Sequence, residues 1–272
     1  MATYGWRPDP RTETDPYGDT VDLVAKDWNV KDFLAKAPSK LADGDVDLSC
    51  YATDSNQFSL SSCAGNATAD SVEILDAIEE EDDAKADGRA PVPQPQLSRL
   101  FVYNMARERM GELALDEGTY IRYCFDVLAR FGICEEAIWP YDESKVFTST
   151  SIKAQRRALG HKIHGFYRIK STEEQRLDDI VAALRAKHPV VFGTLIDSAF
   201  QANSGPTVVG KPGNVTIGGH AMIVVGYIGG LFKVKNSWGS GWRDKGYCLM
   251  KPEYLAWEET QDLWVPTLGV CF

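Results

Sequence analysis

One stretch near the C-terminal end constrains the fold of this chain more than any other. Residues 218–247 read GGHAMIVVGYIGGLFKVKNSWGSGWRDKGY. Two runs rich in Val, Ile and Phe flank the dipeptide Gly229-Gly230, a pattern typical of an antiparallel hairpin. In such a hairpin His220 and Asn236, sixteen residues apart in the sequence, can lie close together on neighbouring strands. An imidazole held by an amide is half of a nucleophilic catalytic site, so the pattern predicts a nucleophile elsewhere in the chain.

The bulk composition limits the partners and the compartment. The chain has 272 residues, 44% hydrophobic and 25% charged, as expected for a soluble globular protein with one large domain or two lobes. A net charge of -10 disfavours nucleic acid and anionic membranes as partners. The N-terminal residues lack the basic and apolar regions of a signal peptide, and the longest apolar run, 221–232, is too short to span a bilayer. We expect a cytoplasmic protein, or one exported without a cleaved signal peptide.

The cysteines offer a candidate nucleophile. Six cysteines with no CxxC pair are too few for a disulfide scaffold and do not form a zinc ribbon motif. A helical pattern begins near Cys63, where Ser61 or Ser62 can cap the helix, and small then apolar residues recur on one face. At a helix N-terminus, free N–H groups and the macrodipole stabilise a thiolate and lower its pKa. The alternative is a buried structural cysteine, the more common state of a single cysteine.

The first part of the chain reads as an extended arm followed by a helical region. Residues 1–45 are rich in Pro, Asp and Gly, with one amphipathic piece around 21–34 that could be a helix. They could form a surface arm that packs on the body, or a segment that lies over a site and controls access. Residues 79–96 are acidic and then Pro-rich, which predicts a solvated loop. Amphipathic helices are expected over 97–109 and 118–131.

The second part of the chain is β-rich. Strands are expected at 166–169, 189–195 and 207–209, with one acidic helix over 172–187. Helices first and strands second favour an α+β protein with two lobes. We place the helical lobe at 46–160 and the β-rich lobe at 161–272.

Taken together, these segments resemble the papain-like cysteine peptidases over about residues 46–255. HAMIVVGY resembles the family's His segment, and FKVKNSWGSGWRDKGY is close to its Asn-Ser-Trp-Gly-x-x-Trp-Gly signature, with Arg243 in place of the final Gly. The family places His and Asn about 130–150 residues after the nucleophile. Here His220 follows Cys63 by 157 residues and Asn236 by 173, and the acidic, Pro-rich insertion is a source of the excess.

The nucleophile segment departs more from the family pattern. Residues 60–64 read LSSCA, whereas the family signature is C-G-[SA]-C-[WY]. Ala64 therefore replaces an aromatic residue, and Leu60 replaces a cysteine, so the family's disulfide cannot form there. Gln57, six residues before Cys63, matches the family's oxyanion-hole Gln. The form LSSCxxNA and the opening YGWRPD resemble a bacterial branch of the family.

The resemblance implies a role for each site residue. Cys63 is the nucleophile, and His220 forms an ion pair with it and protonates the leaving amine. Asn236 holds the imidazole ring, and Trp238 shields their hydrogen bond from water. Gln57 and the Cys63 backbone N–H form the oxyanion hole.

It also implies a substrate groove. Gly118 and Thr119 occupy the positions that pair with the substrate backbone in the family. By the same matching, Ile121, Gly193 and Ala221 line the pocket for the second residue on the acyl side. His161, His164 and His188 have no partner motif and are expected on the surface or in loops.

The resemblance therefore implies a papain-like two-lobed fold: a helical lobe, an antiparallel β-barrel-like lobe, a cleft between them and a C-terminal tail that returns to the helical lobe. It implies a monomeric thiol-dependent endopeptidase that acts on protein or peptide substrates and needs no cofactor and no metal. Transpeptidation or deamidation of a protein partner would use the same site, and an inactive binding relative is a further alternative. The arm is too short for the family's long helical prodomain, so residues 1 to about 40 are expected to lie across the cleft like a propeptide and restrict it.

Overall fold

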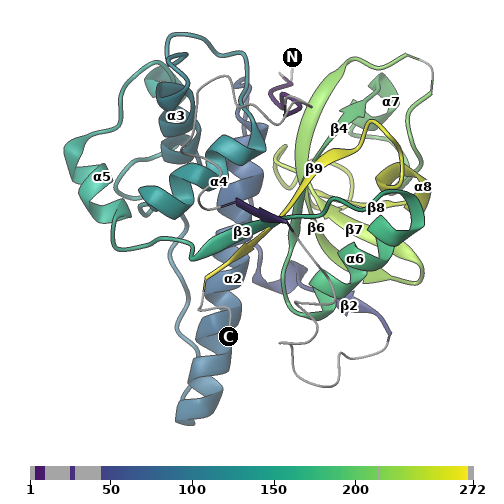
Figure 1. Ribbon diagram of the computed structural model, residues 1–272, viewed down its shortest axis with the longest axis horizontal. Helices are drawn as coiled ribbons and strands as arrows, with labels where there is room; N and C mark the ends of the chain where they lie inside the picture. Colours follow the sequence, from purple (N-terminus) through teal and green to yellow (C-terminus); the bar gives the residue numbers. More distant parts are fainter. Residues whose placement is uncertain (1–3, 10–24, 28–43, 214, 269–272) are drawn as a thin grey trace.

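The computed structural model describes residues 4–9, 25–27, 44–213 and 215–268. Helices α3, α4 and α5 gather on one side of the molecule, the large sheet lies on the other, and α2 runs between them (Figure 1). Among the described residues, one cluster of buried apolar side chains extends through both halves. The predicted α+β, two-lobed architecture is confirmed.

The helical lobe is built around α2 (Cys63–Asp87). The small residues at the start of α2 allow it to lie deep in the molecule, and residues 63–75 are all buried. A Cβ on Gly65 would lie 2.9 Å from Cβ of Tyr103, so α2 and α3 approach closely at this point. The other elements of the lobe are η1 (Ser49–Tyr51), α3 (Arg99–Arg109), α4 (Ile121–Arg130), η2 (Glu143–Lys145) and α5 (Ile152–Ala158).

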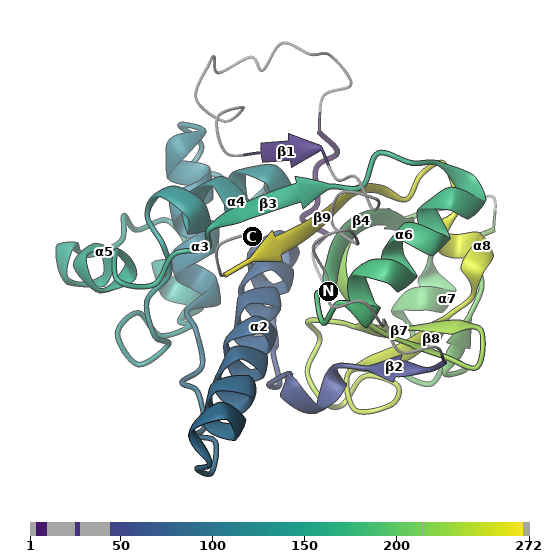
Figure 2. The same ribbon diagram turned by 60° about the horizontal axis from the view of Figure 1, so that its bottom comes forward.

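The prediction of a loop over residues 79–96 was wrong for its first half. Helix α2 continues through the acidic run to Asp87 and ends at Gly88, which has the left-handed φ of 66° that suits a helix C-terminus. Glu, Ala and Lys are good helix formers, and neither Gly nor Pro interrupts residues 79–87. This end of α2 projects beyond the body of the protein (Figure 2).

The β lobe contains a nine-stranded mixed sheet in the order β1-β3-β9-β4-β6-β7-β8-β5, with β2 paired to β6. The β1–β3 and β5–β8 pairs are parallel and all other pairs are antiparallel. The strands are β1 (Ala25–Asp27), β2 (Val46–Asp47), β3 (Gly165–Arg168), β4 (Val190–Ile196), β5 (Val208–Val209), β6 (Gly218–Ile228), β7 (Leu231–Lys235), β8 (Tyr247–Met250) and β9 (Gln261–Thr267). The helices of this lobe are α6 (Glu173–Arg185), α7 (Ser198–Gln201) and α8 (Pro252–Leu255).

The predicted hairpin is confirmed by β6 and β7. Gly229 and Gly230 form its turn with φ values of 55° and 83°, and Ile228 pairs with Leu231 across it. Short β1 falls within the region where a helix was considered, and the rest of residues 21–34 lies outside the described residues.

The last strand links the two lobes. Strand β9 contacts α2 and α4, and Phe166 on β3 packs against both Phe125 on α4 and Trp264 on β9. Within the described part of the chain, none of the helices is long and apolar enough to cross a membrane.

Candidate active site

Cys63 and His220 come together where α2 meets β6. Cys63 is the first residue of α2, and its sulfur accepts a hydrogen bond from the backbone N–H of Ala221 at 3.3 Å. Ala221 directly follows His220 on β6. Cys63 and His220 are both fully buried. The fold thus brings together two residues that are far apart in the sequence.

The helix start differs from the sequence prediction in one respect. Ser62 occupies the N-cap position, but its side chain makes no capping hydrogen bond. Instead its hydroxyl pairs with the hydroxyl of Tyr141 at 2.6 Å and accepts a hydrogen bond from the amide of Asn66 at 2.9 Å. These partners hold the hydroxyl away from the orphan N–H groups of the first turn.

Asn236 and Trp238 hold the imidazole ring. Nε2 of His220 donates to Oδ1 of Asn236 at 2.7 Å, and the same oxygen accepts the backbone N–H of Ser237 at 2.8 Å. The Trp238 indole stacks on the imidazole, with 4.7 Å between ring centroids and an interplanar angle of 29°. Among the described residues Nδ1 of His220 has no hydrogen-bond partner. That nitrogen is therefore the one that can exchange a proton.

Gln57 is anchored between the two lobes. Its backbone N–H donates to the carbonyl of Ser237 at 2.8 Å, and its side-chain oxygen accepts the Ser237 hydroxyl at 2.7 Å. Its amide nitrogen donates to the carbonyl of Leu60 at 2.8 Å. The side chain is fully buried, directly before the turn at residues 58–59 that leads towards Cys63. Gln57 thus lies on the loop that delivers the nucleophile, with its amide orientation fixed by Ser237.

Burial reverses the expected protonation of the pair. Burial raises the pKa of the Cys63 thiol to about 11, although backbone N–H groups of Ala221, Gly5, Ala64 and Cys63 itself act in the opposite direction. Burial also lowers the pKa of His220 to about 4, opposed by its hydrogen bond to Asn236. The helix N-terminus was expected to lower the thiol pKa, but in this conformation desolvation of the charge outweighs it. Both groups are neutral at pH 7 here.

The burial comes from the N-terminal segment, residues 4–9, which runs between the two lobes over Cys63. The carbonyl of Gly5 accepts the N–H of Thr119 at 2.8 Å, and the N–H of Arg7 donates to the carbonyl of Thr119 at 3.2 Å. On the opposite side, the N–H of Trp6 donates to the carbonyl of Gly219 at 3.3 Å. The segment is therefore hydrogen-bonded to both walls of the groove, as an added strand would be.

Glycines make this close approach possible. A Cβ on Gly5 would lie 1.7 Å from the carbonyl oxygen of Ser61, next to the nucleophile. A Cβ on Gly118, whose φ is 82°, would lie 2.0 Å from the carbonyl oxygen of Gly5. Neither position has space for a side chain, so the backbone of the segment lies directly on the backbone of the groove.

Trp6 fills a pocket in the β lobe. Its ring lies on Gly193, where a Cβ would be 2.0 Å from the indole, and its N–H donates to Oδ2 of Asp262 at 3.1 Å. The same carboxylate oxygen accepts the N–H of Asp9 at 2.8 Å, and Oδ1 accepts from Arg168 at 2.7 Å. Asp262 is buried and has a φ of 52°, at the point where the β4–β9 register shifts. Its carboxylate thus receives two donors from the N-terminal segment.

The predicted groove residues make different contacts in the structure. Gly118 and Thr119 contact Gly5, and Gly193 contacts Trp6. Ala221 donates to the sulfur of Cys63. Ile121 is fully buried at the first position of α4.

Two further residues of the groove were not predicted. Gly219 and Asp262 both bind the N-terminal segment. Gly219 precedes His220 and could have been proposed from that position. Asp262 is a single carboxylate in a hydrophobic strand, and nothing in its local sequence indicates that it faces the groove.

The remaining histidines lie elsewhere. His164 is exposed, as expected. His161 is half-buried and pairs with Asp76 at 2.9 Å. The expectation of a surface or loop position also holds for His188, which lies half-buried in the loop between α6 and β4 and donates from Nδ1 to the carbonyl of Pro266 at 3.0 Å. Burial lowers its pKa to about 4.

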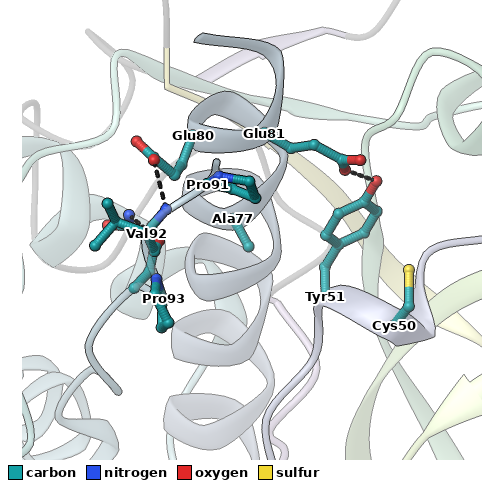
Figure 3. A pocket seen from close by; sticks show the side chains of 9 residues that line it. Cys50, Tyr51, Ala77, Glu80, Glu81, Pro91, Val92 and Pro93 are labelled. Carbon is teal, nitrogen blue, oxygen red and sulfur yellow. Dashed lines mark hydrogen bonds between the residues drawn. The ribbon is translucent and has the colours of Figure 1, made fainter. Parts of the chain in front are cut away.

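A second hollow, of about 380 Å³, lies away from this site (Figure 3). It is bounded by η1, the projecting part of α2 and the Pro-rich segment 91–94. Its carboxylates have internal partners, because Glu81 binds the Tyr51 hydroxyl and Glu80 accepts the N–H of Val92 at 2.7 Å. Cys50 is exposed beside it, and the cysteines of the described residues are all free thiols.

Comparison with known proteins identifies the family to which this chain belongs. The model of the papain family cysteine proteases matches residues 116–259, more than half of the chain, including His220 and Asn236. The structure also resembles that of xylellain, a cysteine protease from Xylella fastidiosa, with a TM-score of 0.76 and 26% identity over 98% of this chain and 97% of that one. The chain therefore belongs to the papain family of cysteine proteases.

Several curated relatives match part of the chain, and two of them show the extent of the match. An uncharacterized peptidase C1-like protein of Acanthamoeba polyphaga mimivirus is 35% identical over 181 residues, covering 62% of this chain and 58% of the viral protein. A cathepsin L-like proteinase of Fasciola hepatica is 29% identical over 141 residues, covering 49% of this chain and 40% of the proteinase. The chain thus spans less than two thirds of the length of these relatives.

Proposed function

We propose that this chain is a thiol-dependent endopeptidase that hydrolyses peptide bonds through Cys63, His220 and Asn236. The observation that carries the proposal is the convergence of the first residue of α2 and the β6–β7 hairpin. The Cys63 sulfur accepts the backbone N–H of Ala221 at 3.3 Å, and the preceding residue, His220, has its Nε2 held by the Asn236 amide at 2.7 Å. Family membership supports the same reaction class.

The chemistry follows from the roles of these groups. His220 takes the proton from the Cys63 thiol, and the thiolate attacks the scissile carbonyl carbon to form a C–S bond. The Gln57 amide and the Cys63 backbone N–H stabilise the oxyanion. The C–N bond breaks as His220 returns the proton to the leaving amine. Water then attacks the thioester, with His220 as base, and releases the acid and the free thiol.

The N-terminal segment keeps this site closed in the proposed enzyme. Gly5 and Trp6 occupy the groove where a substrate chain would bind, and Cys63 and His220 are left with no exposed surface. Both groups are neutral in this state, because burial disfavours their charged forms. Displacement of the segment would hydrate the pair and favour the reactive thiolate–imidazolium form. The segment therefore acts as a propeptide that restricts access.

The hydrolytic proposal is tested with an unstructured fluorogenic peptide library. We expect slow thiol-dependent cleavage by the 272-residue chain, because the N-terminal segment restricts the groove, with loss of cleavage after treatment with iodoacetamide and no cleavage by Cys63→Ala. Cleavage that persists in Cys63→Ala would refute the assignment of the nucleophile. Amide transfer to an added amine with no release of the hydrolysed acid would instead favour transpeptidation.

The role of the segment is tested by Trp6→Ala in the 272-residue chain. This change removes the side chain that fills the pocket over Gly193. We expect faster alkylation of Cys63, measured by peptide-resolved mass spectrometry so that exposed Cys50 does not contribute. An unchanged alkylation rate together with unchanged activity would contradict a restricting role.

A further inference from the structure

A buried cluster of three polar residues lies on the segments that carry the candidate catalytic residues. Nζ of Lys235 forms an ion pair with Oδ2 of Asp70 and donates to the hydroxyl of Ser55 at 2.5 Å. The Ser55 hydroxyl in turn donates to the same Asp70 oxygen at 2.9 Å. Each of the three residues is at most 3% exposed. The cluster is therefore a closed triangle of hydrogen bonds inside the protein.

Each member of the cluster belongs to a segment that carries a candidate catalytic residue. Ser55 lies two residues before Gln57, and Lys235 directly precedes Asn236. Asp70 follows Cys63 by seven residues on α2, which is two helical turns, so both side chains are on the same face of the helix. The three segments come from three separate parts of the sequence. The cluster thus connects the oxyanion donor, the nucleophile and the residue that holds the imidazole.

The ion pair also crosses between the lobes. Asp70 is on α2 of the helical lobe, whereas Lys235 ends strand β7 of the β lobe and pairs there with Tyr247 on β8 and Ile223 on β6. A charge in a buried site is tolerated only where a partner is held in good geometry. The position of Lys235 therefore depends on the position of α2. A shift of either lobe would separate the two charges.

Hydrogen bonds nearby extend the connection towards the site. The carbonyl of Ser55 accepts the N–H of Gly239 at 2.9 Å, and Gln57 exchanges two hydrogen bonds with Ser237. Residues 55–57 of the loop before Cys63 therefore run alongside residues 237–239, next to Asn236, which holds the imidazole. The carboxylate of Glu73, one turn after Asp70, accepts hydrogen bonds from the Thr53 hydroxyl and from the N–H of Leu97, the latter at 2.6 Å.

We propose that Ser55, Asp70 and Lys235 are positioning residues that set the distance and orientation between Cys63 and the His220–Asn236 pair. The inference rests on the proposed peptidase function and adds to it the device that aligns the two lobes. It does not require any of the three residues to contact the substrate. A misalignment of about 1 Å between reacting groups can lower a rate by about a hundredfold, so a cross-lobe connection of this kind affects kcat.

The test separates positioning from simple stabilisation. Single replacement of Asp70 or Lys235 would leave a buried charge without a partner and could prevent folding. The decisive variant is therefore the triple replacement Ser55→Ala, Asp70→Leu and Lys235→Met, in which apolar side chains of similar size replace the whole cluster. Apolar replacement of a buried ion pair commonly preserves stability. The readouts are the melting temperature, kcat, KM and the pH dependence of Cys63 alkylation.

We expect the triple variant to melt close to the wild-type temperature, with KM within about twofold and kcat lower by about tenfold to a hundredfold. The midpoint of Cys63 alkylation should move to higher pH, because a misaligned imidazole no longer stabilises the thiolate. A triple variant with wild-type kcat and a wild-type alkylation profile would overturn the proposal. If the triple variant does not fold, Ser55→Ala, which keeps the ion pair, decides the question: unchanged kcat and alkylation would overturn it, and a shift in both would support it.

A matched control is available in the helical lobe. Asp126 is also buried and pairs with Arg109 at 3.0 Å and with Arg130 one turn away on α4. These ion pairs do not cross to the β lobe. Asp126→Asn should therefore lower the melting temperature and leave the alkylation midpoint unchanged. Wild-type protein that does not hydrolyse peptides would refute the proposed function, whereas the alkylation profile would still report on the positioning role.

Discussion

The indole ring of Trp6 lies directly on the backbone of Gly193. A methyl group at position 193 would be 2.0 Å from the ring, so the pocket can hold this side chain only because a glycine is present. Gly193 also stands opposite Ala221 in the β4–β6 register, and Ala221 contacts the sulfur of Cys63. The position of the N-terminal segment and the geometry of the nucleophile are thus connected through two neighbouring strands.

Gly193→Ala should open the groove while the N-terminal segment is still present. The added methyl group must displace the Trp6 ring, and overpacking of this kind costs about 1–3 kcal/mol. We expect Cys63 to be alkylated about tenfold faster or more, measured by peptide-resolved mass spectrometry. The matched control is Gly165→Ala on β3, where the nearest atom to a new Cβ is 3.7 Å away. Equal alkylation rates in the two variants would contradict this account of the contact.

Trp6→Phe should weaken closure without emptying the pocket. Phenylalanine retains most of the ring but cannot donate to the carboxylate of Asp262, which accepts the indole N–H at 3.1 Å. A hydrogen bond to a charged group contributes about 1.5–3 kcal/mol, so alkylation of Cys63 should become roughly tenfold faster or more. Trp139→Phe is the control, because the Trp139 indole nitrogen is buried with no hydrogen-bond partner among the described residues. A larger effect for the control would count against the role of Asp262.

Gln57→Ala should lower kcat and leave nucleophile formation intact. Loss of one oxyanion donor typically reduces kcat by about 10²–10³. Cys63 should still react with iodoacetamide, because alkylation of the thiolate develops no oxyanion. The measurements are steady-state kinetics on a peptide substrate and the alkylation rate at the same pH. An increase in KM with unchanged kcat would show that Gln57 acts in substrate binding instead.

His188 should make the folded state sensitive to acid. Its pKa is lowered from an ordinary value of 6.5 to about 4 by burial, so the unfolded chain binds the proton more readily than the folded chain. The free energy of unfolding should therefore be unaffected by this group above pH 6.5 and fall as the pH drops towards 4. The full loss is about 3 kcal/mol below that pH.

Denaturant unfolding between pH 7 and pH 4 checks this prediction. A His188→Gln variant should lose less stability than the wild type over that interval, because glutamine does not titrate. His220 is buried as well and its pKa is also lowered to about 4, so the difference between the two proteins isolates His188. A parallel pH dependence in both proteins would contradict the assignment.

The sequence was sufficient for the parts of the site that depend on local pattern. The Gly229-Gly230 turn between two β-branched runs predicts the hairpin, and its register brings His220 near Asn236 as expected. Small residues after Cys63 predict a deeply buried helix, and α2 begins at that residue. These signals are local in sequence, because turn chemistry and helix packing act over a few residues.

Other features arise from long-range contacts that have no local signature. Asp262 faces the groove only because of a register shift between β4 and β9. The Lys235–Asp70 ion pair joins residues 165 positions apart, and each alone resembles an ordinary surface charge in the sequence. The thiol pKa follows from the covering segment, whose desolvation outweighs the helix N-terminus.

Trapping the acyl-enzyme tests the role of Cys63 as nucleophile most directly. A peptide ester is mixed with the Trp6→Ala chain, quenched in acid during turnover and mapped by mass spectrometry. We expect the acyl mass on the peptide that contains Cys63, with no acylation and no hydrolysis after the further change Cys63→Ala. An acyl group on any other residue, or hydrolysis that continues without the Cys63 thiol, would contradict it.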